Sequence, residues 1–200
     1  MLSIASFSFG PLTLPKLPTA VTDYAPCSSI NPGSITFFGY PATTTQAATW
    51  SAMRPRLRGA GVSLVGFQPQ EAYTIVQIAD GTSNTILLCE DAGRPDRYIK
   101  GKLVSVGTRN DGGWGDHESE YGLDGLTVTG PTSTSSPGNC VINCDNNNET
   151  YAFHTGGANH VFADGSVRFI RETVSPQQYA AMITANGGGL TAAENAPLID

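Results

Sequence analysis

The chain has 200 residues, of which 40% are hydrophobic and only 14% are charged, and its formal net charge is −6. This length suits a single domain with an ordinary hydrophobic core, and the hydrophobic fraction excludes a disordered chain. The negative charge argues against a nucleic-acid-binding surface, which relies on clustered Lys and Arg. With 23 Gly and 13 Pro, the composition indicates a loop-rich β protein rather than a helical bundle.

The N-terminal half of the chain predicts loops and short strands. Residues 1–58 show little periodicity and carry turn formers at Asn31–Gly33, which is typical of loops with short strands. Later runs rich in apolar and β-branched residues predict strands over residues 62–67, 74–78 and 85–89. Asp80–Asn84 predicts a turn whose side-chain oxygens bond its own backbone.

Residues 107–150 predict a long loop, because Gly, Asp, Asn, Ser and Thr dominate them. A loop of this length inside a compact domain is usually functional or is held by a ligand. This segment is therefore a candidate binding region.

A β-hairpin is predicted next, because the β-prone runs Val161–Ala163 and Val167–Ile170 flank Asp164-Gly165. Asp-Gly suits a two-residue type I′ turn. In that register Phe162 opposes Val167, and Phe162, Val167 and Phe169 share one face. We expect this face to pack into the core.

Ser175, Pro176 and Gln178 form a capping signature with proline at the first helical position. They predict one short helix over residues 176–185, with a stop at Gly187. The elements together predict an α+β fold, mainly β: an antiparallel sheet with long Gly/Asn-rich loops and a short C-terminal helix. Residues 1–189 are expected to form one domain, and residues 190–200 a mobile tail.

His154 is followed by nine residues and then by Asp164-Gly165, which resembles the prepilin-type processing-associated motif His-x9-Asp-Gly. That motif is typical of a large bacterial family of pilin-like envelope proteins of unknown function. Further segments that resemble this family, in the same order, are Thr22–Ala25, Ile78–Leu87 and Gly138–Cys144. The resemblance implies a pilin-like antiparallel sheet, an extracellular or cell-envelope location, and protein subunits of a surface or pilus-like assembly as partners.

Members of that family usually begin with a short basic leader and a long apolar helix, which Met1–Pro11 does not resemble. That stretch carries no charged side chain and is shorter than the ~20 apolar residues of a transmembrane helix. We therefore expect a globular ectodomain without its anchor, and no membrane span in this chain.

An even number of cysteines in a Gly-rich chain that is expected to be exported favours two disulfides. The favoured pairs are Cys27 with Cys89 and Cys140 with Cys144. The competing interpretation is a zinc site, whose ligands would be Cys140, Cys144, His154 and His160.

Carboxylates and amides are dense in two stretches of the loop predicted over residues 107–150, and calcium takes six to eight oxygen ligands of this kind. Some pilin-like domains carry calcium in such loops, so the resemblance supports a calcium site. The candidate metal ligands are Asp111, Asp116, Asp124 and Asp145. The alternative is that these residues form solvated turns, since no EF-hand pattern is present.

The candidate catalytic residues are His154, Asp164, His117 and Asp116. His117 beside Asp116 suits an acid/base pair, but no Gly-x-Ser-x-Gly elbow accompanies it. The turn explains Asp164 without catalysis, and a hydrogen bond to a nearby loop would explain His154. If the chain is an enzyme, we expect a hydrolase.

The candidate ligand-binding residues are Trp114, Tyr121 and Tyr151, which lie in or beside Gly- and Asn-rich segments. Exposed aromatic rings stack on sugars or on partner side chains, so carbohydrate is a candidate ligand. The alternative for Trp114 is that it fills the core beneath a long loop.

The leading hypothesis is an exported pilin-like structural or adhesion domain that takes part in a cell-surface or secretion-type assembly and is stabilised by calcium. Its rival is a secreted hydrolase that acts on a polysaccharide or an ester. The fold alone does not separate them, because function lies in sites carried by folds.

Overall fold

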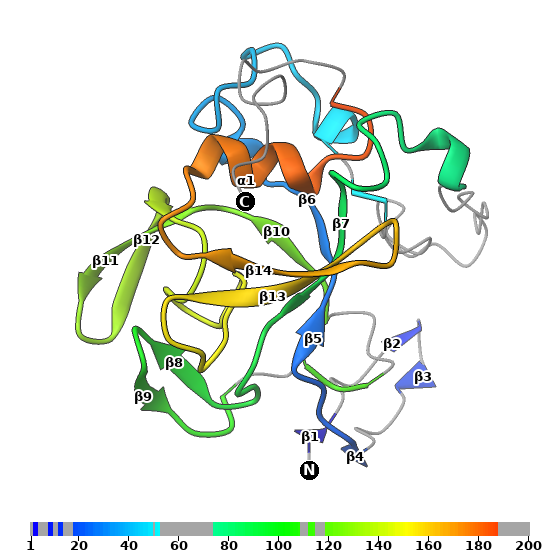
Figure 1. Ribbon diagram of the computed structural model, residues 1–200. Helices are drawn as coiled ribbons and strands as arrows, with labels where there is room; N and C mark the ends of the chain where they lie inside the picture. Colours follow the sequence, from blue (N-terminus) through cyan, green and yellow to red (C-terminus); the bar gives the residue numbers. More distant parts are fainter. Residues whose placement is uncertain are drawn as a thin grey trace.

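The computed structural model describes residues 2–3, 8–9, 12–13, 18–49, 51–52, 74–108, 112–114 and 119–187. At its centre is a four-stranded sheet in the order β14-β13-β7-β5, in which neighbouring strands are antiparallel. These strands are β5 (Tyr24–Ala25), β7 (Ile86–Glu90), β13 (Gly157–Phe162) and β14 (Val167–Arg171). The helix α1 (Pro176–Ile183) lies along one side of this sheet (Figure 1) and packs against β7 and β6 (Cys27–Ile30).

The remaining strands form smaller pairs around this sheet. Antiparallel partners are β1 (Leu2–Ser3) with β4 (Pro18–Thr19), β2 (Ser8–Phe9) with β3 (Leu12–Thr13), β8 (Arg97–Ile99) with β9 (Lys102–Ser105), and β11 (Leu126–Gly130) with β12 (Ser133–Cys140). β10 (Tyr121–Leu123) pairs with β6 in parallel. Short 3-10 helices are η1 (Pro32–Ser34), η2 (Gln46–Thr49) and η3 (Ile75–Gln77). Among the described residues this is a mostly antiparallel β structure with one short C-terminal helix, which confirms the predicted fold class.

The strand predictions for the N-terminal half have mixed outcomes. β7 confirms the strand predicted over residues 85–89, and the run 62–67 lies outside the described residues. The strand predicted over 74–78 is wrong: this run forms η3, where Val76 is 92% exposed. The reason is local, because the Thr74 N–H donates a hydrogen bond to Gln77 Oε1 at 2.7 Å. A Thr and a Gln three residues apart stabilise a helical turn in this way.

The predicted turn between these segments is confirmed. The Asn84 side-chain amide donates to the Asp80 carbonyl at 3.0 Å, and the Thr85 hydroxyl donates to the Gly81 carbonyl at 3.0 Å. Gly81 has a φ of +94°, which glycine adopts at little cost.

The predicted C-terminal helix is also confirmed. Ser175 Oγ accepts a hydrogen bond from the Gln178 N–H at 3.1 Å, and Pro176 is the first helical residue. The helix ends at Ile183, two residues earlier than predicted, because Thr184 is extended and its hydroxyl donates to the Asp80 carboxylate at 2.9 Å. In the described part of the chain, no helix is both long enough and apolar enough to cross a membrane.

The hairpin of β13 and β14 is confirmed, but its predicted two-residue turn is wrong. The Phe162 N–H donates to the Ser166 carbonyl, and the Gly165 N–H donates to the Phe162 carbonyl, each at 2.9 Å. Three residues therefore connect the strands, and the last of them, Gly165, has a φ of +84°. This is the next most common hairpin class, in which a glycine in the left-handed region forms a bulge.

The extra loop residue shifts the register by one. Val161 opposes Val167, and Asn159 opposes Phe169. A shift of one residue moves side chains to the other face of a strand. Phe162 is 1% exposed, whereas Val167 and Phe169 are 65% and 48% exposed, so the prediction that these three share a core face is wrong.

The long loop predicted over residues 107–150 contains β10, β11 and β12, so that prediction is wrong over much of its length. Side-chain amides hold part of what remains. Asn146 Oδ1 accepts from the Tyr98 N–H at 2.8 Å, and Asn146 Nδ2 donates to the carbonyls of Ala92 and Asp96 at 3.0 and 2.9 Å. One amide therefore satisfies buried backbone groups of a neighbouring loop without a bound ligand.

A chain of hydrogen bonds runs through the core, and its members are at most 4% exposed. His160 Nδ1 lies 3.0 Å from the Ala158 carbonyl oxygen, which can only accept, so in neutral His160 Nδ1 carries the proton. His160 Nε2 therefore accepts from the Tyr179 hydroxyl at 3.0 Å. Tyr179 in turn bonds Thr150, which bonds Tyr121. The chain ties β13 to α1 from inside the protein.

The predicted disulfide between Cys140 and Cys144 is confirmed, with the two Cα atoms 6.0 Å apart. The zinc interpretation is wrong in this state, because both sulfurs that it requires are bonded to each other. The two histidines of the proposed zinc site also lie in different environments. His160 belongs to the buried hydrogen-bond chain, whereas the His154 side chain is half exposed.

The predicted bridge between Cys27 and Cys89 is wrong, because both are buried free thiols. Each sulfur has its own partner: Cys27 Sγ lies 3.6 Å from the Ser29 carbonyl, and Cys89 Sγ lies 3.7 Å from the Tyr179 hydroxyl. Burial raises the pKa of both thiols. Since the thiolate is the reactive species, these two cysteines are expected to be inert.

Replacing Cys140 and Cys144 together with Ser is expected to lower the free energy of unfolding by about 2 kcal/mol, because the bridge closes a short loop. Urea denaturation measures this change. In unreduced, denatured wild-type protein, alkylation and mass analysis should label only the two cysteines that are free in the structure. Labelling of all four cysteines would contradict the bridge.

Candidate functional site

The outer face of the four-stranded sheet, defined as the face opposite α1, carries a row of side chains across all four strands. Opposed residues of antiparallel strands point to the same face: Tyr24 opposes Glu90, and Asn159 opposes Phe169. The Asn159 N–H donates to Glu90 Oε2 at 2.6 Å and joins the two halves of the row. Tyr24 and Phe169, at its ends, are 53% and 48% exposed. We call Tyr24, Glu90, Asn159 and Phe169 the outer row.

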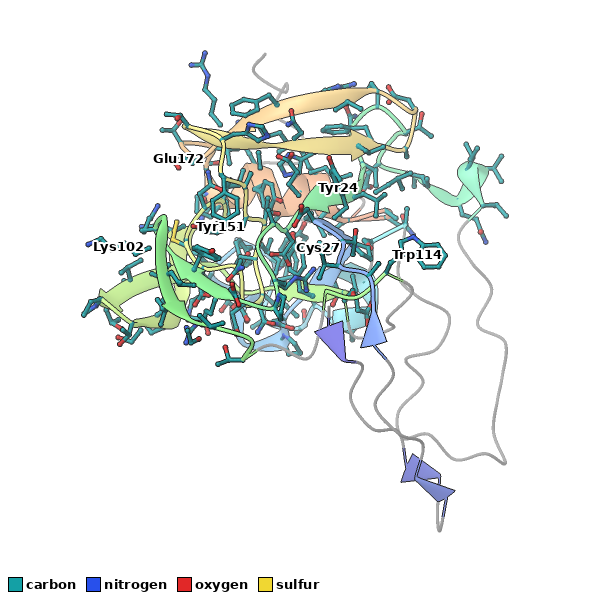
Figure 2. All side chains as sticks on the ribbon, turned by 90° about the horizontal axis from the view of Figure 1, so that it is seen from below. Tyr24, Cys27, Lys102, Trp114, Tyr151 and Glu172 are labelled. Atoms are coloured by element: carbon teal, nitrogen blue, oxygen red, sulfur yellow. A yellow bond between two sulfur atoms is a disulfide. The ribbon has the colours of Figure 1, made fainter. Side chains whose placement is uncertain are left out.

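The neighbouring residues along the same strands point the other way. His160 follows Asn159 in β13, and its ring contacts Tyr179 of α1. Successive side chains of a strand alternate between faces, so Asn159 points away from the helix. Figure 2 shows the hairpin of β13 and β14 at the margin of the molecule, with α1 on its inner side.

Glu90 is the centre of the site. It ends β7, is 8% exposed, and accepts hydrogen bonds at both carboxylate oxygens. Oε2 accepts from the Asn159 N–H, and Oε1 lies 3.2 Å from Asn159 Nδ2 and 3.2 Å from His154 Nε2. A charged carboxylate makes stronger hydrogen bonds than a neutral acceptor, so Glu90 holds Asn159 and His154 in fixed positions.

His154 lies in the turn before β13, and its side chain is 54% exposed. Its Nε2 faces the Glu90 carboxylate, so in neutral His154 this nitrogen carries the proton. The ring of Phe169 stands edge-on to the imidazole, with centroids 6.3 Å apart. We call Glu90, His154 and Asn159 the His154 cluster.

Asp164 lies at the other end of β13 from His154. It accepts hydrogen bonds from the Ser166 N–H and hydroxyl at 2.9 and 2.7 Å. These bonds lower the pKa of the Asp164 carboxyl. Six strand residues at about 3.3 Å each separate Asp164 from His154 by roughly 20 Å, so the two do not act on one substrate bond. The structure gives Asp164 the role of shaping the hairpin turn.

The other predicted catalytic and metal residues are only partly described. Asp111, Asp116 and His117 lie outside the described residues. Asp145 is 1% exposed, and its two carboxylate oxygens accept hydrogen bonds from Arg97 Nη2 and Nε at 2.6 and 3.2 Å. Asp124 lies elsewhere, half buried, and burial raises its pKa. Among the described residues, no group of three or more His, Cys, Asp or Glu side chains is arranged to hold a metal ion.

The three aromatic residues predicted to bind a ligand differ in their exposure to solvent. Tyr121 and Tyr151 are 4% and 1% exposed, so neither presents a ring face to a ligand. Tyr121 belongs to the buried hydrogen-bond chain. The Tyr151 hydroxyl accepts a hydrogen bond from the Gly101 N–H at 2.9 Å and so has a structural role. Trp114 is 77% exposed and projects from the surface (Figure 2), so it does not fill the core.

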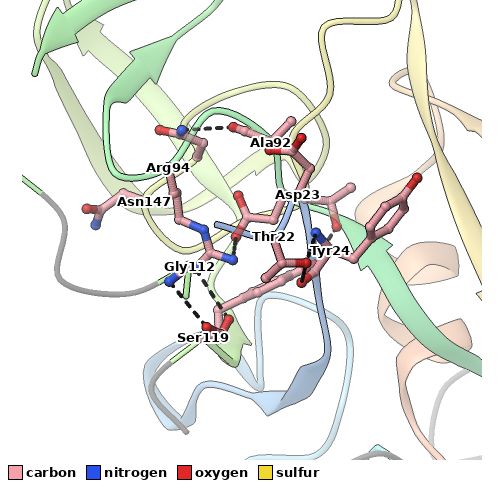
Figure 3. Close-up of polar contacts among 12 residues, drawn as sticks. Thr22, Asp23, Tyr24, Ala92, Arg94, Gly112, Ser119 and Asn147 are labelled. Carbon is pink, nitrogen blue, oxygen red and sulfur yellow. Dashed lines mark hydrogen bonds and ion pairs between the residues drawn. The ribbon is translucent and has the colours of Figure 1, made fainter. Parts of the chain in front are cut away.

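A buried ion pair lies beneath the segment that leads into β5. Arg94 Nη2 is 3.1 Å from Asp91 Oδ2, and the two side chains are 1% and 0% exposed. Arg94 Nη1 also donates to the Ser119 carbonyl at 3.3 Å (Figure 3). Gly112 packs so closely that a Cβ there would lie 2.8 Å from the Arg94 Cβ. The pair joins three loops and gives this region its shape.

Sequence reasoning found His154 but missed the other members of the site. Glu90 directly follows an apolar strand run, and Asn159 stands between small and aromatic residues of β13. A polar residue at an alternating position of a predicted strand is a weak signal for an exposed face. Nothing in the sequence indicates that residues 24, 90 and 159 lie side by side.

A family model with the description "Protein of unknown function (DUF1559)" matches residues 21–177. No curated protein and no solved structure matches the chain. The matched range includes the outer row, the His154 cluster and all four strands of the central sheet. Because the match covers well over half of its length, the chain belongs to the DUF1559 family of proteins of unknown function.

Proposed function

We propose that this chain is an exported, pilin-like structural or adhesion domain that takes part in a cell-surface or secretion-type assembly. The outer face is its binding surface. The observation that carries the proposal is the exposure of Tyr24, Val167 and Phe169 on one ordered sheet face, at 53%, 65% and 48%. Large apolar side chains gathered on one face of a soluble domain are typical of interaction sites.

Two further observations support the proposal. The Cys140–Cys144 disulfide suits an oxidising compartment outside the cytoplasm. The resemblance of the His154 to Asp164-Gly165 spacing to the prepilin-type motif also favours an envelope location. A binding role suits the His154 cluster better than hydrolysis, because among the described residues His154 hydrogen-bonds the Glu90 carboxylate and no hydroxyl or thiol nucleophile.

A cross-linking experiment tests the proposal. A photo-reactive amino acid replaces Val167 on the outer face or, as a control, Val128 on β11, which is 40% exposed. Cells that produce each protein are irradiated and then fractionated. We expect the protein in the envelope or extracellular fraction, with specific adducts from position 167 and none from position 128. Recovery in the cytoplasm, or the same adducts from both positions, would contradict the proposal.

A further inference from the structure

The outer row has an aromatic ring at each end and polar groups between them. It spans three inter-strand steps of about 4.8 Å, so Tyr24 and Phe169 stand roughly 14 Å apart across the sheet. Aromatic faces pack well against the C–H faces of sugar rings. Two such faces at this separation suit an extended chain of several sugar rings better than a single small molecule.

Glu90 determines which hydrogen-bonding atoms of the outer row remain available to a ligand. Both Glu90 oxygens already accept bonds from Asn159 and His154. Between the two rings, Asn159 Oδ1 and His154 Nδ1 are left for a ligand, and no hydrogen bond among the described residues uses either of them. In neutral His154, with Nε2 protonated toward Glu90, both of these atoms are acceptors. A ligand that lies between the two rings can therefore donate hydrogen bonds to these two atoms, as hydroxyl groups do.

The charge of the site narrows the ligand class further. Glu90 carries a carboxylate at the centre of the row, and the whole chain has a net charge of −6. The Glu90 carboxylate would repel an anionic polymer, and the His154 cluster contains no Lys or Arg side chain to offset this repulsion. A peptide added as a strand would run along β14, the edge strand of the described sheet, whereas the outer row crosses the strands.

We infer that the outer row binds a neutral, extended polysaccharide. Sugar rings stack on Tyr24 and Phe169, and their hydroxyls donate to Asn159 and His154. The inference rests on the proposed adhesion role and names the ligand class for the same face. Glu90 acts as a positioning residue, which fixes the two acceptors without contacting the sugar.

Calorimetric titration of the full chain tests the inference. The probes are cellohexaose and hexa-N-acetylchitohexaose, two neutral extended oligosaccharides. We expect wild type to bind at least one of them, and Phe169→Ala and Tyr24→Ala each to weaken binding by about tenfold. The control is Phe153→Ala. Phe153 is 60% exposed, but its ring packs on Tyr98 and Tyr151 outside the outer row, with centroids 5.0 and 5.7 Å away.

Circular dichroism and the melting temperature verify that each variant is folded. Absence of binding by wild type at millimolar probe would overturn the inference, as would equal losses in Phe169→Ala and Phe153→Ala. The cross-linking experiment separates this failure from failure of the proposed function. Protein adducts at position 167 without sugar binding would leave the assembly role standing and replace the polysaccharide with a protein partner.

Discussion

Replacing Arg94 with Met is expected to lower the free energy of unfolding by about 3–5 kcal/mol, because it leaves the Asp91 carboxylate buried without its cation. The two side chains are 1% and 0% exposed and lie 3.1 Å apart. Methionine keeps most of the side-chain volume, so the loss reports the charge rather than a cavity. Urea denaturation at neutral pH measures the change.

The double variant Arg94→Met with Asp91→Leu separates the buried charge from other effects. Removing both charges is expected to recover most of the loss, since an apolar pair of similar volume is often as stable as a buried ion pair. Arg171→Met, at the exposed end of β14, is the matched control and should leave stability unchanged. If the double variant is as unstable as Arg94→Met, the ion pair is not the cause.

The elements that the sequence predicts well are those whose signals are local. The Ser175 cap of α1 and the turn at Asp80–Asn84 depend on neighbours within a few residues, and both form as predicted. The run Thr74–Ile78 shows the limit of this approach. Its β-branched residues favour a strand, but the Gln77 side chain caps the Thr74 N–H and produces an exposed 3-10 turn.

The hairpin shows how a small local error changes a surface. Asp-Gly serves a two-residue turn and a three-residue loop almost equally well. The choice of the longer loop moves Phe169 and Val167 from the predicted core to the outer face, where they are 48% and 65% exposed. A correct prediction of the element therefore gave an incorrect candidate core, and it concealed the face that we propose as the binding surface.

The candidate site depends on pairings that no local signal reveals. Tyr24, Glu90 and Asn159 meet because three strands distant in sequence align in one register. The predicted calcium ligand Asp145 likewise meets Arg97, 48 residues away, and this guanidinium occupies both of its oxygens. The sequence identifies which side chains are chemically able to bind a ligand. The tertiary fold determines whether other groups of the protein already occupy their donors and acceptors.

His160 is expected to contribute a loss of stability on acidification between pH 6.5 and about 4. Burial lowers the pKa of His160 from 6.5 to about 4. Between these values the unfolded chain binds a proton that the folded protein does not, so the free energy of unfolding falls as the pH falls. A difference of this size is worth about 3 kcal/mol. Protonation would place the second proton of the imidazole ring on Nε2, and this nitrogen could then no longer accept a hydrogen bond from the Tyr179 hydroxyl.

Glu149 acts in the opposite direction over the same range. Burial raises the pKa of Glu149 well above its usual 4.5, so this carboxyl contributes a loss of stability as the pH rises above 4.5. The wild-type profile therefore mixes the two effects. A variant that removes His160 alone is needed to isolate its part.

His160→Gln provides that comparison, with His154→Gln as the control, which removes an exposed histidine and leaves the buried chain intact. Denaturation curves between pH 4 and 8 should show that the stability difference between wild type and His160→Gln shrinks as the pH falls from 6.5 toward 4. The glutamine lacks the proton-binding site, so its own profile should lack the loss of stability that His160 contributes on acidification. A constant difference across this range would show that His160 is protonated in the folded state. In that case the hydrogen-bond chain through Tyr179 and Thr150 would have to run in the opposite direction.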